Sequence, residues 1–159
     1  MVSMPALVVS SIGGNPRLAA GAAEFVAHSF TELGSDFQPD GLDSDLLDIK
    51  RQYIDRGGQF FVGTENGTVV ATSAVKRSDA TTAEIKRVRV ASDRRHQGYG
   101  GRVLQAALTW AAGHGYSRAV LDTQASNAPA LALFGKFGFQ ETGRTGSSVL
   151  MSRDLGPNA

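Results

Sequence analysis

The spacing of hydrophobic residues changes several times along the chain, and each change predicts a new secondary-structure element. The first apolar run, residues 6–10, is short and valine-rich, as in a strand. Apolar residues then recur at helical spacing across residues 18–33, after an Asn15-Pro16 pair that suits a helix start. The chain is therefore predicted to open with a strand and a helix that ends near Gly34.

A second helix is predicted between the turn-forming residues 39–41 and the glycine pair Gly57-Gly58. Acidic residues early in this segment suit the positive end of a helix dipole. The apolar residues that share one face of this helix are Leu42, Leu46, Ile49 and Tyr53.

Three strand-like segments follow, and the third breaks the expected alternation. Residues 59–63 and 68–75 form a predicted hairpin, with Glu-Asn-Gly at residues 65–67 as its turn. In the segment 83–90, apolar and charged side chains occur at both odd and even positions. Mixed faces of this kind predict a β-bulge or a local splay of the strand, which often accompanies a functional site.

The second half of the chain alternates helices and strands. One helix is predicted over residues 103–112 and another over residues 128–136, entered through Asn127. Further strands are predicted at residues 119–122, from residue 138, and at residues 148–153. The resulting order, β-α-α-β-β-β-α-β-α-β-β, is that of an α/β domain with a mixed sheet. We expect one domain over residues 1–159, with its core at about 5–154.

A basic, glycine-containing run lies between the strand 83–90 and the helix 103–112. Residues 95–102, here called the glycine loop, read Arg-His-Gln-Gly-Tyr-Gly-Gly-Arg. Glycines allow a tight turn with outward N–H groups, and a helix start adds unpaired donors and a positive dipole end. Residues 86–102 carry six basic side chains and one acidic one, whereas the whole chain is only +1. The loop is therefore predicted to bind a phosphate or pyrophosphate; the alternative is a surface turn with solvated arginines.

The composition excludes several other kinds of site. The sequence has no cysteine, so thiol nucleophiles, disulfides and thiolate metal sites are ruled out. Its three histidines are widely spaced, and we expect no metal site. The basic cluster is short and lacks an aromatic platform, which argues against nucleic acid. No apolar run is long enough to span a membrane and the N-terminus lacks a basic signal region, so we expect a cytoplasmic protein.

Two motifs in this order resemble those of the Gcn5-related N-acetyltransferase (GNAT) family. Arg95-x-x-Gly98-x-Gly100 is similar to the family's acetyl-CoA signature, [Arg/Gln]-x-x-Gly-x-[Gly/Ala]. The segment from Asn127 to Phe139 resembles the family's Asn…Ala…Leu-Tyr-x-x-x-Gly-Phe segment. The resemblance covers nearly the whole chain in element order, but only at the level of the fold in the N-terminal half. It implies a mixed, mostly antiparallel central sheet flanked by about four helices, and an acyltransferase that uses acetyl-CoA.

The resemblance also implies where the donor binds. The pantetheine arm is expected along residues 88–90, in a gap between this strand and residues 119–122. The pyrophosphate is expected on the backbone N–H groups of the glycine loop, with Gly98 and Gly100 permitting close approach and Arg94 and Arg95 adding charge. The expected cofactor-binding residues are Val88, Arg89, Val90, Arg95, His96, Gln97, Gly98, Tyr99, Gly100, Gly101, Arg102, Asn127 and Phe134.

Glu84 is the candidate general base, because an amine must lose a proton before it attacks a thioester. It lies fourteen positions before Gly98, the offset of the catalytic glutamate in the family's histone-acetyltransferase branch. The alternative is a strand glutamate paired with Lys86 or Arg87. The resemblance further implies that a backbone N–H near Val90 stabilises the oxyanion.

Phe134 stands at a place that is commonly Tyr in the family, where the tyrosine protonates the departing CoA thiolate. A phenyl ring cannot donate a proton. Another donor such as Tyr99 or Tyr116, proton delivery by water, or departure of the thiolate without an acid would each replace it. We favour water, because a thiol pKa of about 8.5 makes the thiolate a tolerable leaving group.

The acceptor side is the least specified. Phe30, Phe37 and Tyr53, together with Glu84, are the predicted substrate-binding residues. Nearby acids would attract a cationic amine, or would simply cap and solvate the second helix: Asp36, Asp40, Asp43, Asp45 and Asp48.

The sequence thus predicts acetyl transfer to the primary amine of a small molecule or amino acid, by direct attack in a ternary complex. Acetylation of a protein N-terminus or lysine, and a CoA-binding module without turnover, are the alternatives. A homodimer is compatible with the resemblance.

Overall fold

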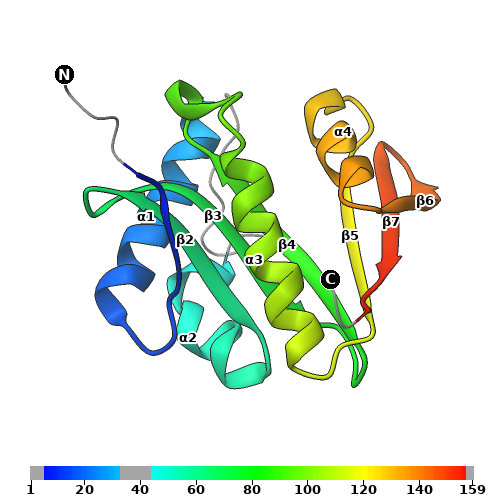
Figure 1. Cartoon of the computed structure of the whole chain (residues 1–159), viewed down its shortest axis with the longest axis horizontal. Helices are drawn as coiled ribbons and strands as arrows, with labels where there is room; N and C mark the ends of the chain where they lie inside the picture. The colour runs from blue at the N-terminus through cyan, green and yellow to red at the C-terminus, as the bar shows by residue number, and fades with distance from the viewer. Residues whose placement is uncertain (1–5, 33–43, 157–159) are drawn as a thin grey trace.

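The computed structural model describes residues 6–32 and 44–156, which form a seven-stranded sheet with helices on both faces (Figure 1). The strand order is β1-β2-β3-β4-β5-β7-β6. All neighbouring strands are antiparallel except β4 and β5. The elements in chain order are β1 (Val8–Ser11), α1 (Pro16–Glu32), the 3₁₀ turn η1 (Ser44–Leu47), α2 (Ile49–Gln52), the 3₁₀ turn η2 (Ile54–Arg56), β2 (Gln59–Glu65), β3 (Thr68–Arg77), β4 (Thr82–Val90), the 3₁₀ turn η3 (Ser92–Arg94), α3 (Tyr99–Gly113), β5 (Arg118–Gln124), α4 (Ala128–Lys136), β6 (Gln140–Thr145) and β7 (Ser148–Asp154). The predicted mixed, mostly antiparallel sheet with four helices is confirmed.

Local signals placed the starts of α1 and α4 and the hairpin correctly, whereas α3 begins at Tyr99, one turn before the predicted residue 103. The Asn15 side chain accepts the N–H groups of Arg17 and Leu18 at 3.0 and 3.2 Å and so caps α1. Asn127 caps α4 in the same way, through the N–H of Ala130 at 3.2 Å. The β2–β3 turn lies at Asn66-Gly67, both with positive φ, as the sequence predicted.

The second helix was predicted to be continuous, and this prediction is wrong. The structure replaces it with η1, a single turn of α2 and η2. Asp48 starts α2 by accepting the N–H of Arg51 at 3.2 Å, and Gly57 ends η2 with a φ of 85°. The predicted start at residues 39–41 lies outside the described residues. The face itself was predicted correctly, because Leu46, Ile49 and Tyr53 are buried together.

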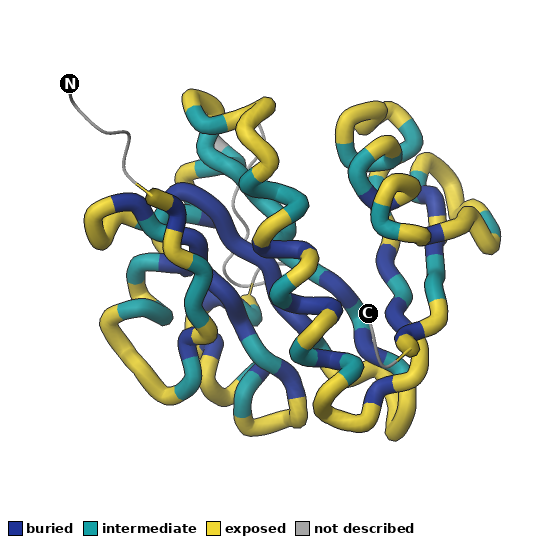
Figure 2. Tube along the Cα trace, in the orientation of Figure 1, coloured by how far each residue is buried: buried dark blue, intermediate teal, exposed yellow. Residues whose placement is uncertain are grey.

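Two hydrophobic cores lie on opposite faces of the sheet. One packs α3 and α4 against the sheet, with Leu104 and Leu108 fully buried. The other packs α1 and α2 against it, with Tyr53 and Phe60 at its centre. Figure 2 shows the strands between the two helical layers as the most continuously buried part of the chain. Among the described residues, no helix is long and apolar enough to cross a membrane.

The predicted bulge in β4 is confirmed. Thr72 of β3 pairs with Arg89 and Ala74 pairs with Lys86, so one residue of β3 opposes two residues of β4. Arg87, one of the two, has a φ of 57°, in the left-handed region that a residue with a Cβ rarely adopts.

The bulge sorts the mixed sequence of β4 into two uniform faces. Ile85 and Val88 join the core under α3, and a methyl of Val90 lies near Gly100 of α3. The charged residues face α1 and α2 instead: Glu84, Lys86, Arg87 and Arg89. Without the extra residue, strict alternation would place Val88 and Val90 on the charged face.

A buried threonine anchors the bulge. The Thr72 hydroxyl donates to the carbonyl oxygen of Arg87 at 2.8 Å, and Thr72 is completely buried. The bulge carbonyl has lost its regular ladder partner, so this hydroxyl satisfies a group that would otherwise be buried and unpaired.

Thr72→Val should therefore lower the free energy of unfolding by about 2 kcal/mol, because the shape is kept while a buried carbonyl loses its donor. Thr142→Val is the matched control, since the Thr142 hydroxyl also donates to a carbonyl, that of Leu150 at 3.3 Å, but on the surface. Urea denaturation measures both. A loss no larger than that of the control would contradict the role of Thr72.

Candidate active site

The strands β4 and β5 run side by side only at their beginnings. They pair in parallel at Thr82, Ala83 and Glu84 of β4, and then diverge (Figure 1). Within residues 6–32 and 44–156, no strand pairs with residues 85–90 on the side away from β3. This side is called the free edge of β4 below. The resemblance places the pantetheine arm at this position, and backbone groups on an unpaired strand edge are suited to bind its amides.

The free edge presents the N–H of Val90. On the other side of the strand, the N–H of Ala91 donates to the carbonyl of Val70 on β3 at 2.8 Å. Successive residues of a strand direct their N–H groups to opposite sides, so the N–H of Val90 is directed away from β3. This geometry fits the oxyanion donor implied by the resemblance.

The glycine loop offers a run of unused backbone donors. Within residues 6–32 and 44–156, the N–H groups of residues 95–101 find no hydrogen-bond acceptor. His96 and Gly98 have φ angles of 62° and 80°, and α3 begins directly after Gly98. Free N–H groups at a helix start form a site for an anion, so the structure supports the predicted phosphate loop.

The glycines of the loop serve different purposes. A Cβ on Gly98 would meet nothing within 4 Å, so its positive φ is what favours glycine there. A Cβ on Gly100 would lie 3.3 Å from Leu133, and one on Gly101 would lie 3.1 Å from Phe137. Gly100 and Gly101 therefore let α3 approach α4, which is a packing reason that the sequence did not indicate.

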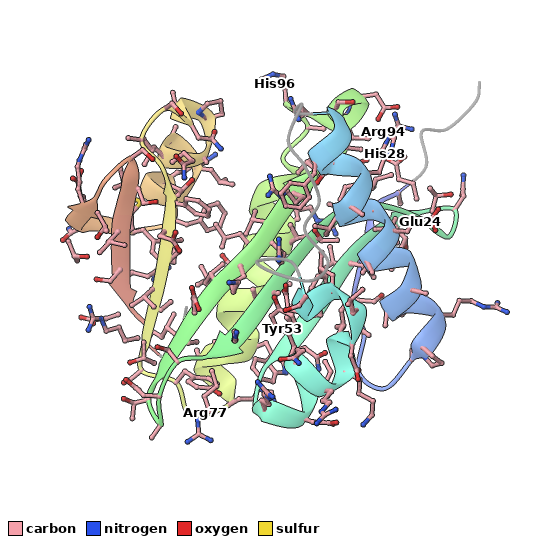
Figure 3. The ribbon with its side chains drawn as sticks, turned by 180° about the vertical axis from the view of Figure 1, so that it is seen from behind. Glu24, His28, Tyr53, Arg77, Arg94 and His96 are labelled. Carbon is pink, nitrogen blue, oxygen red and sulfur yellow. The ribbon has the colours of Figure 1, made fainter. Side chains whose placement is uncertain are left out.

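The arginines around the loop are not equally available. The Arg94 Nε donates to Glu65 at 2.8 Å, and its Nη1 lies 3.1 Å from Asp93, so Arg94 is already paired. Arg102 donates to the Leu7 carbonyl at 3.2 Å. Arg95 is exposed and forms no ion pair with a described residue. It remains the candidate for a phosphate contact, and Figure 3 shows neighbouring His96 at the same end of the molecule as Arg94.

The structure does not support a tyrosine as the acid for the thiolate. The Tyr99 hydroxyl donates to Glu65 on β2, which is separated from β4 by β3. The Tyr116 hydroxyl donates to the Gly57 carbonyl at 2.5 Å, beyond the opposite end of α3. Phe134 is buried in the core and packs edge-on against Phe139 at 5.9 Å. Delivery by water remains the favoured route.

Glu84 lies where β4 and β5 stop pairing. It is half-buried on the face toward α1 and α2, and it opposes Lys76 across the strands. It forms no ion pair with a described residue, because Arg87 pairs with Asp45 and Lys86 stays beyond contact distance. The alternative role as a partner of Lys86 or Arg87 is therefore not supported, and the role as base stays a prediction.

A second cluster joins the α2 region to the bulge. Arg87 contacts Asp45 at 2.6 Å, with side chains only 9% and 12% exposed, and the Tyr53 hydroxyl donates to the same carboxylate. Burial alone would raise the pKa of Asp45, but hydrogen bonds from Arg87 and Tyr53 hold that pKa below its ordinary value. Burial and the adjacent Asp45 raise the pKa of Tyr53, so its hydroxyl stays protonated. The cluster therefore fixes Arg87 in its left-handed conformation.

This cluster corrects two expectations for the acceptor side. Tyr53 is fully buried between α2 and the sheet (Figure 3). It therefore packs in the core behind the predicted acceptor site and does not line that site. Asp45 is neutralised by Arg87 and cannot attract a cation, and Asp48 caps α2. Phe30 of α1 lies under the Arg89 guanidinium, 5.0 Å from it. Phe37 and the remaining predicted acids lie outside the described residues: Asp36, Asp40 and Asp43.

Two hollows occur elsewhere on the described surface. One of about 500 Å³ lies between α1 and the η1–α2 segment, and one of about 440 Å³ lies at the C-terminal end of α3. Neither is lined by Glu84, Phe134, Tyr99 or a predicted cofactor-binding residue, although Tyr116, the alternative proton donor considered above, lines the second. They are therefore separate from the free edge of β4.

Because the folded-state pKa of Asp45 lies below its ordinary 3.8, the stability it adds is present above about pH 4 and is lost as the pH falls through the folded value. The wild type should therefore exceed Asp45→Asn in unfolding free energy by a constant amount at about pH 5–7, and by less at about pH 3. Urea denaturation across this range measures the difference. Asp55→Asn, which breaks the exposed 2.9 Å pair with Lys50, is the control. A difference that grows toward low pH would contradict the assignment.

The sequence was compared with known families and proteins. The model described as "Acetyltransferase (GNAT) family" matches residues 26–139. Probable N-acetyltransferase family 8 member 5 of Mus musculus is 31% identical over 114 residues, covering 69% of this chain and 50% of that protein. N-acetyltransferase 8 of Homo sapiens is 32% identical over 108 residues, covering 64% and 48%. The chain thus spans about half the length of these curated relatives.

Solved structures agree on the fold. A GNAT-family acetyltransferase of Staphylococcus aureus superimposes with a TM-score of 0.83 at 20% identity, covering 95% of this chain and 100% of that one. The PaiA N-acetyltransferase of Thermoplasma acidophilum, solved in complex with coenzyme A, gives 0.68 at 16% identity, with 94% and 99% covered. The family match extends over most of the chain and includes both motifs and the free edge of β4. The chain belongs to the GNAT family of N-acetyltransferases.

Proposed function

We propose that this protein transfers the acetyl group of acetyl-CoA to the primary amine of a small molecule or amino acid, by direct attack in a ternary complex. The observation that carries the proposal is the continuity of two backbone features. The free edge of β4 ends at Val90, and the free N–H groups of the glycine loop begin five residues later, at Arg95. One extended ligand with amides at one end and phosphates at the other would use both.

The residues of this chain fit the parts of the donor. The free edge of β4 can bind the pantetheine amides as an added strand would. The N–H groups of the glycine loop and the positive end of α3 suit the pyrophosphate, with Arg95 beside them. The side-chain oxygen of Asn127 is used to cap α4, so its amide NH₂ is the group left for the pantetheine.

The same residues support a sequence of proton and charge movements. Glu84 accepts a proton from the acceptor amine, directly or through water, which frees the lone pair that attacks the thioester carbon. The N–H of Val90 donates to the oxyanion as the carbonyl becomes tetrahedral. The carbon–sulfur bond then breaks, and the extra proton that the attacking nitrogen still carries passes through water to the thiolate, since Phe134 has no proton to give.

The acceptor would enter on the face toward α1 and α2. The apolar face of β4 is closed by α3, whereas the opposite face carries Glu84 without an ion-pair partner among the described residues. A carboxylate there favours a cationic amine over a neutral alcohol.

The proposal is tested by incubating the purified protein with acetyl-CoA and measuring thiol release with a panel of acceptors. The panel contains small amines, free amino acids, and peptides with a free N-terminus or a lysine. Transfer to a small amine or amino acid is the expected result. Transfer to the peptides alone would replace the proposed acceptor by a protein, and tight CoA binding without any transfer would replace the enzyme by a binding module.

Glu84→Gln should slow acetyl transfer most strongly at low pH, by about 100-fold near pH 6.5, because removal of the amine's proton then limits the rate. The deficit should shrink toward about pH 9, where more of the acceptor is already neutral. Glu141→Gln, on the exposed strand β6, is the control. A deficit of the same size at every pH would mean that Glu84 acts in some other way.

A further inference from the structure

One buried carboxylate holds the chain on both sides of residues 95–98, the first half of the glycine loop. Glu65, the last residue of β2, is only 6% exposed. One of its oxygens accepts the Arg94 Nε at 2.8 Å, and the other accepts the Tyr99 hydroxyl. Arg94 ends η3 and Tyr99 begins α3, so residues 95–98 lie between two points fixed to one carboxylate.

The loop needs such support. His96 has a φ of 62°, in the left-handed region that residues with a Cβ seldom adopt. The N–H groups of residues 95–101 make no bond to a described residue, so internal hydrogen bonding does not hold the shape of this part of the loop. The side chains of Arg94 and Tyr99, on either side of residues 95–98, supply the restraint instead.

Both oxygens of the Glu65 carboxylate are engaged by residues that flank the loop segment 95–98. A buried carboxylate is costly unless it is paired, and Arg94 and Tyr99 together occupy both oxygens of Glu65. The hydrogen bond from Tyr99, aided by Arg94, keeps the pKa of Glu65 below its usual range, and the same bond raises the pKa of Tyr99. Glu65 is thus ionised and Tyr99 protonated at neutral pH, and the pairing persists there.

We propose that Glu65 is a positioning residue for the pyrophosphate of the donor. Through Arg94 and Tyr99 it holds the glycine loop with its N–H groups arranged for the phosphates before the donor arrives. It touches neither the thioester nor the acceptor. This inference rests on the proposed function, because it takes the glycine loop as the pyrophosphate site.

The role predicts an effect limited to donors that carry the pyrophosphate. S-acetylpantetheine has the thioester and the pantetheine amides of acetyl-CoA but lacks its nucleotide and phosphates. Glu65→Gln should raise the KM for acetyl-CoA about tenfold and leave kcat within about twofold, because preorganised binding is lost and the chemistry is not. The KM for S-acetylpantetheine should stay within about twofold of the wild type.

Two further variants make the test specific. Glu141→Gln removes a carboxylate that also accepts an arginine Nε, at 2.7 Å, but on exposed β6, and neither donor should respond. Tyr99→Phe removes one hydroxyl and should raise the KM for acetyl-CoA about threefold, with little further change when combined with Glu65→Gln. Because it alters so little, it also tests the proposal if Glu65→Gln does not fold.

Four results would overturn the inference. An equal rise in KM for both donors would indicate general destabilisation, and a lower KM for acetyl-CoA would mean that Glu65 merely weakens the charge of Arg94. If the Glu65 and Tyr99 variants kept the wild-type KM values while the wild type preferred acetyl-CoA to S-acetylpantetheine, the role of Glu65 alone would be overturned. A wild type that binds CoA no more tightly than pantetheine in calorimetry would overturn the loop assignment, and the proposed function with it.

Discussion

The structure depends on how β4 departs from regular pairing. It leaves β5 after Glu84, and it gains one residue against β3 at Arg87. The first departure creates a free backbone edge inside an otherwise continuous sheet. The second turns every apolar residue beyond it toward α3 and every charged one toward α1 and α2. One strand thereby supplies an apolar core face, a charged face and a free backbone edge.

The same arrangement of side chains occurs near both left-handed backbone positions close to the site. Asp45 accepts from Tyr53 and Arg87, and Glu65 accepts from Tyr99 and Arg94. Each low-exposure carboxylate therefore joins one tyrosine and one arginine. Arg87 itself has a positive φ, and His96, which also has a Cβ and a positive φ, lies in the sequence between Arg94 and Tyr99. The remaining such residue among those described, Asn66, sits in a hairpin turn, where asparagine needs no such support. These acids act as anchors for the backbone.

The sequence predicted features whose signals are local. Caps at Asn15 and Asn127 and the Asn66-Gly67 turn each act within three residues. The bulge was also predictable, because a change of face leaves a mark in the pattern itself. The anchoring pairs were not, since Asp45 and Arg87 lie 42 positions apart, and Glu65 and Tyr99 lie 34 apart. Likewise, helical spacing placed Tyr53 on an inward face but could not distinguish a core position from a pocket wall.

The free edge of β4 and the glycine loop are proposed to bind one donor together. Amide hydrogen exchange followed by NMR, with and without acetyl-CoA, tests it at single residues. The N–H groups of Val90 and of residues 98–101 should exchange more slowly when the donor is present. The N–H of Ala91, already bonded to Val70, should change little. Unchanged exchange at Val90, with protection only around the hollow between α1 and η1–α2, would contradict binding of one donor by the free edge of β4 and the glycine loop.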